Sequence, residues 1–198
     1  KEKPSAEKWR MEPSRHPEFF HIAVSVNTSM MDKEAPKMTE RNILFMVLGM
    51  TPQVITETLW ALCVQENTPV HEIHVMTTSL GKKMLLQGDP ERKIPAILGK
   101  NGILEQFNRD YHLKCSIPGS HIHVFCNQEQ VLLEDIRDTA ENSLAADQIS
   151  GVLEKLSKIP DRRLFCSVAG GRKTMGIFAA LAMSLYGKSQ DQLMHVLV

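Results

Sequence analysis

The sequence predicts an α/β fold, in which a mostly parallel sheet carries helices on both of its faces. Two observations lead to this prediction. Apolar, strand-like runs alternate with helical patterns from residue 41 to residue 198, and no tandem hairpin signals separate them. Residues 1–40 are instead polar and carry four prolines, which is typical of a tail or linker. We therefore expect one Rossmann-like domain over residues 41–198.

The first half of this domain contains two strand patterns and two helical ones. The continuous apolar run 41–48 is typical of a central parallel strand that is buried on both faces. Apolar residues then recur at helical spacing over 54–63, and Thr51-Pro52 is expected to open that helix with a hydroxyl cap and a proline. Residues 71–76 predict the second strand. Residues 91–111, which glycines interrupt, predict one or two helices.

The second half repeats the alternation and ends on a strand. The expected elements are, in order, a strand over 121–126, a connection over 130–142, a helix from about 143 to 157, a strand over 164–168, a helix over 172–185 and a strand over 193–198.

A glycine pair stands between the strand 164–168 and the helix that follows it. Such a turn leaves backbone N–H groups free at the start of the helix, where the helix dipole also favours an anion. Arg172 and Lys173 add positive charge directly after Gly170-Gly171, so a phosphate-bearing ligand is expected. A Walker loop is excluded because Ser167 and Arg172 stand where it needs glycines. A tight turn with two solvated cations is the alternative interpretation.

Polar residues also follow two other predicted strands. Thr51 comes after the first strand, and the hydroxyl-rich run Thr77, Thr78 and Ser79 comes after the second. Parallel sheets bind ligands outside the carboxyl ends of their strands, so these residues and the glycine pair are expected at one rim. For Thr77 to Ser79 two interpretations stay open, which are ligand contact and an ordinary helix cap.

Composition excludes several classes of function. The formal net charge is zero, which argues against duplex DNA held along a broad basic face. No apolar run approaches the length of a membrane span, and there is no secretory pattern at the start of the sequence. The four cysteines are far apart, as expected for thiols in a reducing cytoplasm.

Four histidines form two pairs at the starts of predicted strands, namely His71 with His74 and His121 with His123. Histidines spaced in this way on strands can hold a metal ion. No nearby Asp or Cys completes a ligand set, so strand-edge histidines are the preferred interpretation. No metal site and no cofactor are predicted.

Five stretches, taken in chain order, resemble one known family. They are residues 49–59 (GMTPQVITETL), residues 72–78 (EIHVMTT), Asp135-Ile136-Arg137 with Glu141-Asn142, residues 167–176 (SVAGGRKTMG) and residues 195–198. Together they resemble the CRISPR-associated Rossmann-fold (CARF) domains, and among these the ring nucleases of type III CRISPR systems.

This resemblance implies a homodimer that binds cyclic oligoadenylate, with cyclic tetra-adenylate as the expected ring, and that cleaves it without a metal. In such enzymes a ribose 2′-hydroxyl attacks its own 3′-phosphate. By resemblance, Lys173 would stabilise the charge of the transition state and Thr51 would orient the phosphate or the ribose. The further ligand-binding residues that the resemblance implies are Gly49, Met50, Pro52, Gln53, Thr77, Thr78, Ser79, Arg137, Asn142, Ala169, Gly170, Gly171, Arg172 and Thr174.

Three alternatives remain at this stage. Arg137 and Asn142 are expected in the loop before a helix, and the turn around Arg137 can simply hold the start of that helix by ion pairing. The protein as a whole can be a sensor that binds the ring without cleaving it. It can also be an unrelated α/β nucleotide or phosphosugar protein, for which tight binding of a mononucleotide would be the evidence.

Overall fold

A computed structural model describes residues 41–196, and the predicted tail over 1–40 lies outside the described residues. Five strands form one sheet in which every neighbouring pair is parallel. The strands are β1 (Arg41–Val47), β2 (Glu72–Thr77), β3 (Ile122–Val124), β4 (Arg162–Ser167) and β5 (Gln192–Met194). They lie in the order β3-β2-β1-β4-β5, which confirms the predicted α/β, Rossmann-like fold.

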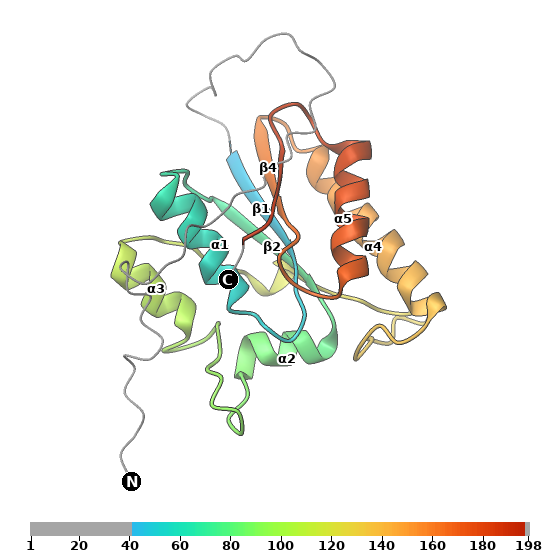
Figure 1. The fold of residues 1–198 in the computed structure, drawn as a ribbon, viewed down its shortest axis with the longest axis horizontal. Helices are drawn as coiled ribbons and strands as arrows, with labels where there is room; N and C mark the ends of the chain where they lie inside the picture. Colours follow the sequence, from blue (N-terminus) through green and yellow to red (C-terminus); the bar gives the residue numbers. More distant parts are fainter. Residues whose placement is uncertain (1–40, 197–198) are drawn as a thin grey trace.

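Helices cover both faces of this sheet (Figure 1). They are α1 (Val54–Leu59), which continues into the π-helical segment η3 (Trp60–Gln65), α2 (Ser79–Gln87), α3 (Ile103–Tyr111), the short 3₁₀ helix η4 (Gly119–His121), α4 (Thr139–Ser157) and α5 (Lys173–Tyr186). Figure 1 shows α1 and α3 on one side and α4 and α5 packed together on the other, with α2 at the end of the sheet. Among residues 41–196, no helix is both long and apolar enough to cross a bilayer.

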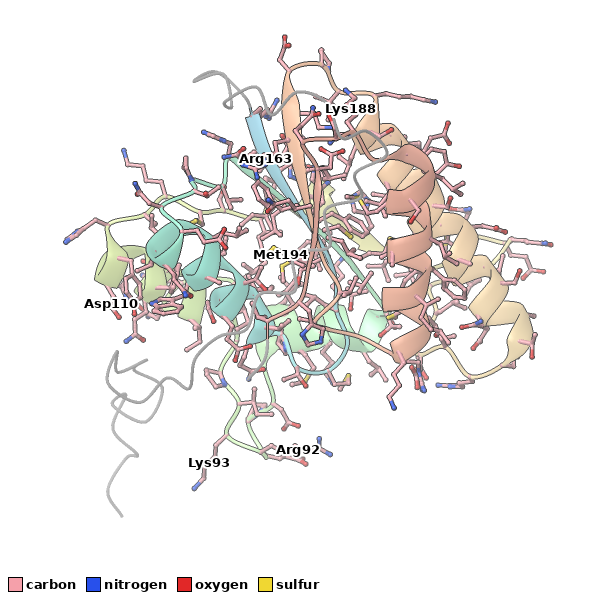
Figure 2. The ribbon with its side chains drawn as sticks, turned by 45° about the horizontal axis from the view of Figure 1, so that its top comes forward. Arg92, Lys93, Asp110, Arg163, Lys188 and Met194 are labelled. Carbon is pink, nitrogen blue, oxygen red and sulfur yellow. The ribbon has the colours of Figure 1, made fainter. Side chains whose placement is uncertain are left out.

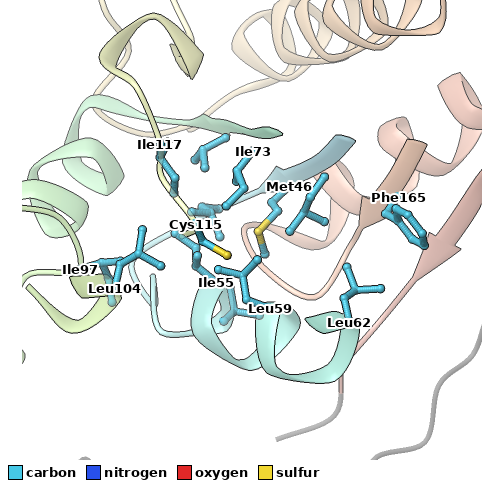
Figure 3. Close-up of a cluster of buried hydrophobic side chains, with 14 of the residues drawn as sticks. Met46, Ile55, Leu59, Leu62, Ile73, Ile97, Leu104, Cys115, Ile117 and Phe165 are labelled. Carbon is cyan, nitrogen blue, oxygen red and sulfur yellow. The ribbon is translucent and has the colours of Figure 1, made fainter. Parts of the chain in front are cut away.

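β1 is the centre of the core. Its residues from Ile43 to Val47 are completely buried, because successive side chains of a strand point to opposite faces and both faces are covered. Leu44 and Met46 join the cluster under α1 and α3, and Figure 3 shows Met46 there beside Ile55 and Ile73. Ile43, Phe45 and Val47 join the cluster under α4 and α5. The apolar run therefore predicted this central strand correctly.

Two helices do not start where the sequence suggested. α1 begins at Val54, after a turn in which Pro52 O accepts a hydrogen bond from Ile55 N, and the exposed Thr51 does not cap it. α4 begins at Thr139 instead of 143, because the Asp138 carboxylate accepts from Glu141 N at 2.8 Å. The prediction that Asn142 precedes this helix is therefore wrong, since Asn142 lies in its first turns.

The segment between α2 and α3 contains less helix than expected. Only Ile103–Tyr111 is helical within the stretch 91–111, and the residues before it form turns closed by a bridge between Asp89 and Ile94. A glycine at 99, with φ of 101°, and a second one at 102 account for the late start of α3. Figure 2 shows Arg92 and Lys93 at the projecting end of this segment.

A buried ion pair joins β4 to Asp191, the residue before β5. Arg162 and Asp191 are 0% and 3% exposed, and the Arg162 guanidinium binds the Asp191 carboxylate. The same carboxylate accepts from Leu164 N at 2.8 Å and from Lys188 N at 2.7 Å. Asp191 therefore fixes the turn that leads from α5 into β5, and Figure 2 shows Arg163 and Lys188 at this end of the molecule.

Candidate functional site

The loops after β1 and β4 lie in direct contact, because these two strands are neighbours in the sheet. A Cβ atom added to Gly49 would lie 3.1 Å from Gly171 Cα, and one added to Gly170 would lie 2.6 Å from Val47 O. Gly171 also has a φ of 76°, which favours glycine. These glycines are needed so that the two backbones can meet. The predicted convergence of the β1 and β4 tips at one rim is confirmed.

Replacing Gly170 with alanine tests this close approach. The new methyl group would collide with Val47 O, a backbone atom of the central strand, so we expect a loss of about 1–3 kcal/mol in the free energy of unfolding. Gly151→Ala in α4 is the matched control, since nothing lies within 4 Å of its added Cβ. That control should gain up to about 1 kcal/mol. Urea unfolding measures both, and equal effects would contradict the packing described.

The residues at the end of β2 also lie at this rim, and the hydroxyl groups of its two threonines form hydrogen bonds within the protein. Thr77 Oγ1 donates to Leu48 O at 2.9 Å, and Thr78 Oγ1 accepts from Gly81 N at 3.2 Å as the N-cap of α2. Both threonines are buried, whereas Ser79, the first residue of α2, is half-buried. Of the two open interpretations, the structure favours the helix cap for Thr78, whereas the Thr77 hydroxyl ties the end of β2 to the loop after β1.

The start of α5 brings two cationic residues, Arg172 and Lys173, to this rim. Arg172 is the N-cap residue and Lys173 is the first residue of the helix, where the N–H groups have no partner within the helix. The Lys173 side chain is exposed, and no carboxylate among residues 41–196 pairs with it. The helix dipole, the N–H groups at the start of the helix and an exposed ammonium group together favour an anion here.

The Arg172 side chain, unlike that of Lys173, forms an ion pair with a nearby carboxylate. Its Nε donates to Asp135 Oδ1 at 2.9 Å, and a second bond joins the guanidinium to Asp135 Oδ2. The hydrogen bond from Arg172 is the main cause that holds the pKa of Asp135 below its usual range. Arg137 is paired in turn with Glu134 at 2.6 Å. A phosphate would have to compete with these carboxylates for either arginine, whereas Lys173 is already available.

The other predicted ligand-binding residues differ in exposure. Met50 is 47% exposed and Thr51 is exposed, whereas Pro52 is buried. Ala169, Gly170 and Thr174 are half-buried, and Gly49 is half-buried between the two loops. Thr51 and Met50 on one loop and Lys173 on the other are thus the side chains of this group that a ligand reaches most easily.

Two buried polar atoms at the strand tips lack partners within the described part of the chain. They are Oε1 of Gln53, the N-cap of α1, and Nδ1 of His195. His195 directly follows β5, whose Met194 O accepts from Val168 N at 2.9 Å, so it lies beside the β4 tip. Sequence reasoning gave His195 no role of its own. The predicted strand over 193–198 placed His195 inside the strand, whereas β5 ends at Met194 and His195 follows it at the rim, where a polar atom without a partner is a candidate contact for a ligand.

This rim does not contain a set of metal ligands. Within residues 41–196, the one group with suitable spacing is Glu72, His74 and His121, which begins at the amino end of β2. Glu72 and Thr77 are the first and last residues of β2, so about 16 Å separates them along the strand.

Comparisons with known proteins give a family and one weak structural likeness. A family model described as CRISPR-associated protein NE0113 matches residues 51–198. No curated protein matches the chain. A crystal structure of UDP-N-acetylglucosamine 2-epimerase is similar with a TM-score of 0.38 and 14% sequence identity, over 79% of this chain and 32% of that one. This chain thus spans about a third of the length of that structure. Since the family model takes in well over half of the sequence, the protein belongs to the CRISPR-associated protein NE0113 family.

Proposed function

We propose that this protein is a ring nuclease with a CARF domain, which binds cyclic oligoadenylate and cleaves it without a metal ion. Cyclic tetra-adenylate is the expected substrate, and its removal would switch off type III CRISPR signalling. The observation that carries the proposal is Lys173, which is exposed and pairs with no carboxylate among residues 41–196, at the start of α5 directly after a glycine loop that touches the β1 tip. Membership of a CRISPR-associated family supports it.

The proposed reaction needs little covalent chemistry from the protein. A ribose 2′-oxygen attacks the adjacent phosphorus as it loses its proton, the bond from phosphorus to the 5′-oxygen breaks, and the 5′-oxygen takes up a proton. The products carry a 2′,3′-cyclic phosphate and a 5′-hydroxyl group. Lys173 would stabilise the negative charge that builds up on the phosphate oxygens, and Thr51 would hold the phosphate or ribose in line.

A test of activity can separate cleavage from binding. We expect the full chain, incubated with cyclic tetra-adenylate in EDTA, to give linear di-adenylate that ends in a cyclic phosphate. Chromatography against synthetic standards identifies the product. An intact ring after long incubation with stoichiometric protein would reject the enzyme. A ring that is bound but intact would instead identify a sensor, and preference for a mononucleotide would contradict both proposals.

The proposal includes a homodimer, because a ring with approximate two-fold symmetry fits a cleft made of the same loops from two chains. An apolar stripe on α5 supports this part of the proposal. Ile177, Leu181 and Leu185 follow one another at spacings of four, so they share one helix face, and they are 57%, 57% and 74% exposed. Large apolar side chains that lie together on a surface are typical of a contact with another molecule.

Leu181→Glu is expected to convert the dimer into a monomer. The carboxylate would be placed in the middle of an apolar contact, where an unpaired charge is costly. Light scattering after size-exclusion chromatography measures the mass. Val64→Glu is the matched control, since Val64 is 37% exposed on η3 and belongs to the other face of the sheet. A wild-type chain that is monomeric at all concentrations would remove the dimer from the proposal.

A further inference from the structure

Four ionisable side chains gather where β2 meets the start of β3. Glu72 and His74 are two residues apart on β2 and therefore lie on the same face. β3 pairs with β2 so that Ile122 lies opposite Val75, which brings His121 next to His74. The two imidazole rings are stacked, with centroids 4.0 Å apart, and the ring centroid of His123 lies 5.4 Å from that of His74.

The carboxylate of Glu72 connects this cluster. Its Oε1 lies 2.6 Å from His74 Nε2 and 3.8 Å from His121 Nε2. Burial works to raise the pKa of Glu72, but the hydrogen bond with His74 and the charge of Arg41 outweigh it and lower that pKa. Burial lowers the pKa of His74, and it lowers the pKa of His123 to about 4. A carboxylate oxygen and imidazole nitrogens are the kinds of ligand atom that divalent transition metals bind.

We propose that Glu72, His74 and His121 bind one divalent transition metal ion of the zinc class. Their ligand atoms all lie within 4.8 Å of one another. Tetrahedral zinc with bonds of about 2.0–2.1 Å needs ligand atoms roughly 3.4 Å apart. The distances of 2.6 and 3.8 Å to Glu72 Oε1 lie on either side of that value, so small side-chain rotations make the site. Water would occupy the fourth position.

His123 fits the role of an outer partner that orients a ligand. Its Nε2 lies 3.1 Å from His74 Nδ1. With the proton of His74 on Nδ1 and donated to His123, His74 Nε2 is free to bind the metal, as in many zinc sites. His121 adds a second observation, because its buried Nδ1 has no hydrogen-bond partner among residues 41–196. A water molecule at this place would relieve that deficit and would leave His121 Nε2 to face the metal.

A bound metal ion would stabilise the edge of the sheet that β3 forms. β3 is only three residues long and is held by its pairing with β2. A metal that joins Glu72 and His74 of β2 to His121, the last residue of η4, would fix the start of β3. This inference is independent of the proposed cleavage, because the cluster begins at the amino end of β2, whereas the proposed site for the cyclic oligoadenylate lies at the carboxyl ends of the strands.

Zinc alone is the probe for this site. The full chain is treated with a chelator and dialysed, and ZnCl₂ is then titrated in by calorimetry. We expect one zinc ion per chain and a rise of the melting temperature with zinc concentration, since a ligand of the folded state stabilises it. Loss of even an outer-shell partner costs about 10–100-fold in affinity. His121→Gln should therefore cost at least that much, whereas His112→Asn, on the exposed C-cap of α3, should leave affinity unchanged.

Arg41→Ala tests the same site through a variant that should bind zinc more tightly than the wild type. The exposed Arg41 pairs with Glu72 Oε2 and competes with a cation for this carboxylate, so its removal should tighten zinc binding several-fold. This variant keeps the test decisive if His121→Gln fails to fold. Absence of zinc binding by the wild type, equal affinity in wild type and His121→Gln, or unchanged or weaker binding in Arg41→Ala would each overturn the proposal.

Discussion

Lys173→Ala is expected to lower the rate of cyclic tetra-adenylate cleavage by about 100- to 1,000-fold, which is the usual cost of removing one preorganised group that stabilises a transition-state oxyanion. The reason is local: Lys173 is exposed at the start of α5 and no carboxylate in the described part of the chain neutralises it. Binding should weaken much less, because the N–H groups of the helix start remain. Single-turnover rates and equilibrium binding of labelled ring measure the two effects separately.

Lys188→Ala is the matched control for this prediction, because Lys188 is also exposed but lies at the other end of the molecule (Figure 2). It should cleave at the wild-type rate. Lys173→Arg keeps the charge and should retain part of the activity, although its planar group differs from a compact ammonium group. Wild-type turnover in Lys173→Ala would show that this side chain does not carry the proposed catalysis.

Asp191→Ala should have the largest effect on stability, a loss of about 3–5 kcal/mol in the free energy of unfolding. The substitution leaves the fully buried Arg162 charge without its carboxylate. It also removes the acceptor of two backbone N–H groups, those of Leu164 and Lys188. Within residues 41–196, the Arg162 guanidinium would retain only its 3.2 Å bond to Ser157 O, which cannot neutralise the charge.

Urea denaturation followed by circular dichroism measures this loss. Glu154→Ala is the control, since it breaks an exposed ion pair with Lys158 on α4 and should cost no more than about 1 kcal/mol. A loss of similar size in Asp191→Ala would mean that the buried guanidinium finds another partner or water. The arrangement of β4 and β5 described above would then need revision.

The sequence predicted the central strand and the meeting of the β1 and β4 tips because both follow from local patterns and one general rule. An apolar run predicted β1, and the rule on strand ends placed the Thr51 loop and the glycine pair together. The start of α4 was missed although Asp138 and Glu141 have the spacing of a capping pair. That signal was available and local.

Other features depend on pairings that a single sequence does not reveal. Arg162 and Asp191 stand far apart in the chain, and a charged residue at the start of a strand is usually solvated. The approach of His121 to His74 depends on the register between β2 and β3. Glu72 was not predicted as a metal ligand beside His74 and His121, because the sequence was searched only for Asp and Cys near the histidines. Side-chain clusters of this kind need the tertiary structure.

The position of β1 between β2 and β4 has a consequence for biosynthesis. β1 ends at residue 47 and β4 begins at residue 162, so a chain emerging from the ribosome carries one bare, apolar strand edge until most of it has been made. Such an edge invites pairing with other chains, and parallel contacts between distant segments form slowly. The rim where the tips of β1 and β4 meet therefore forms late in translation, because the nascent protein lacks one of its two loops until β4 has docked.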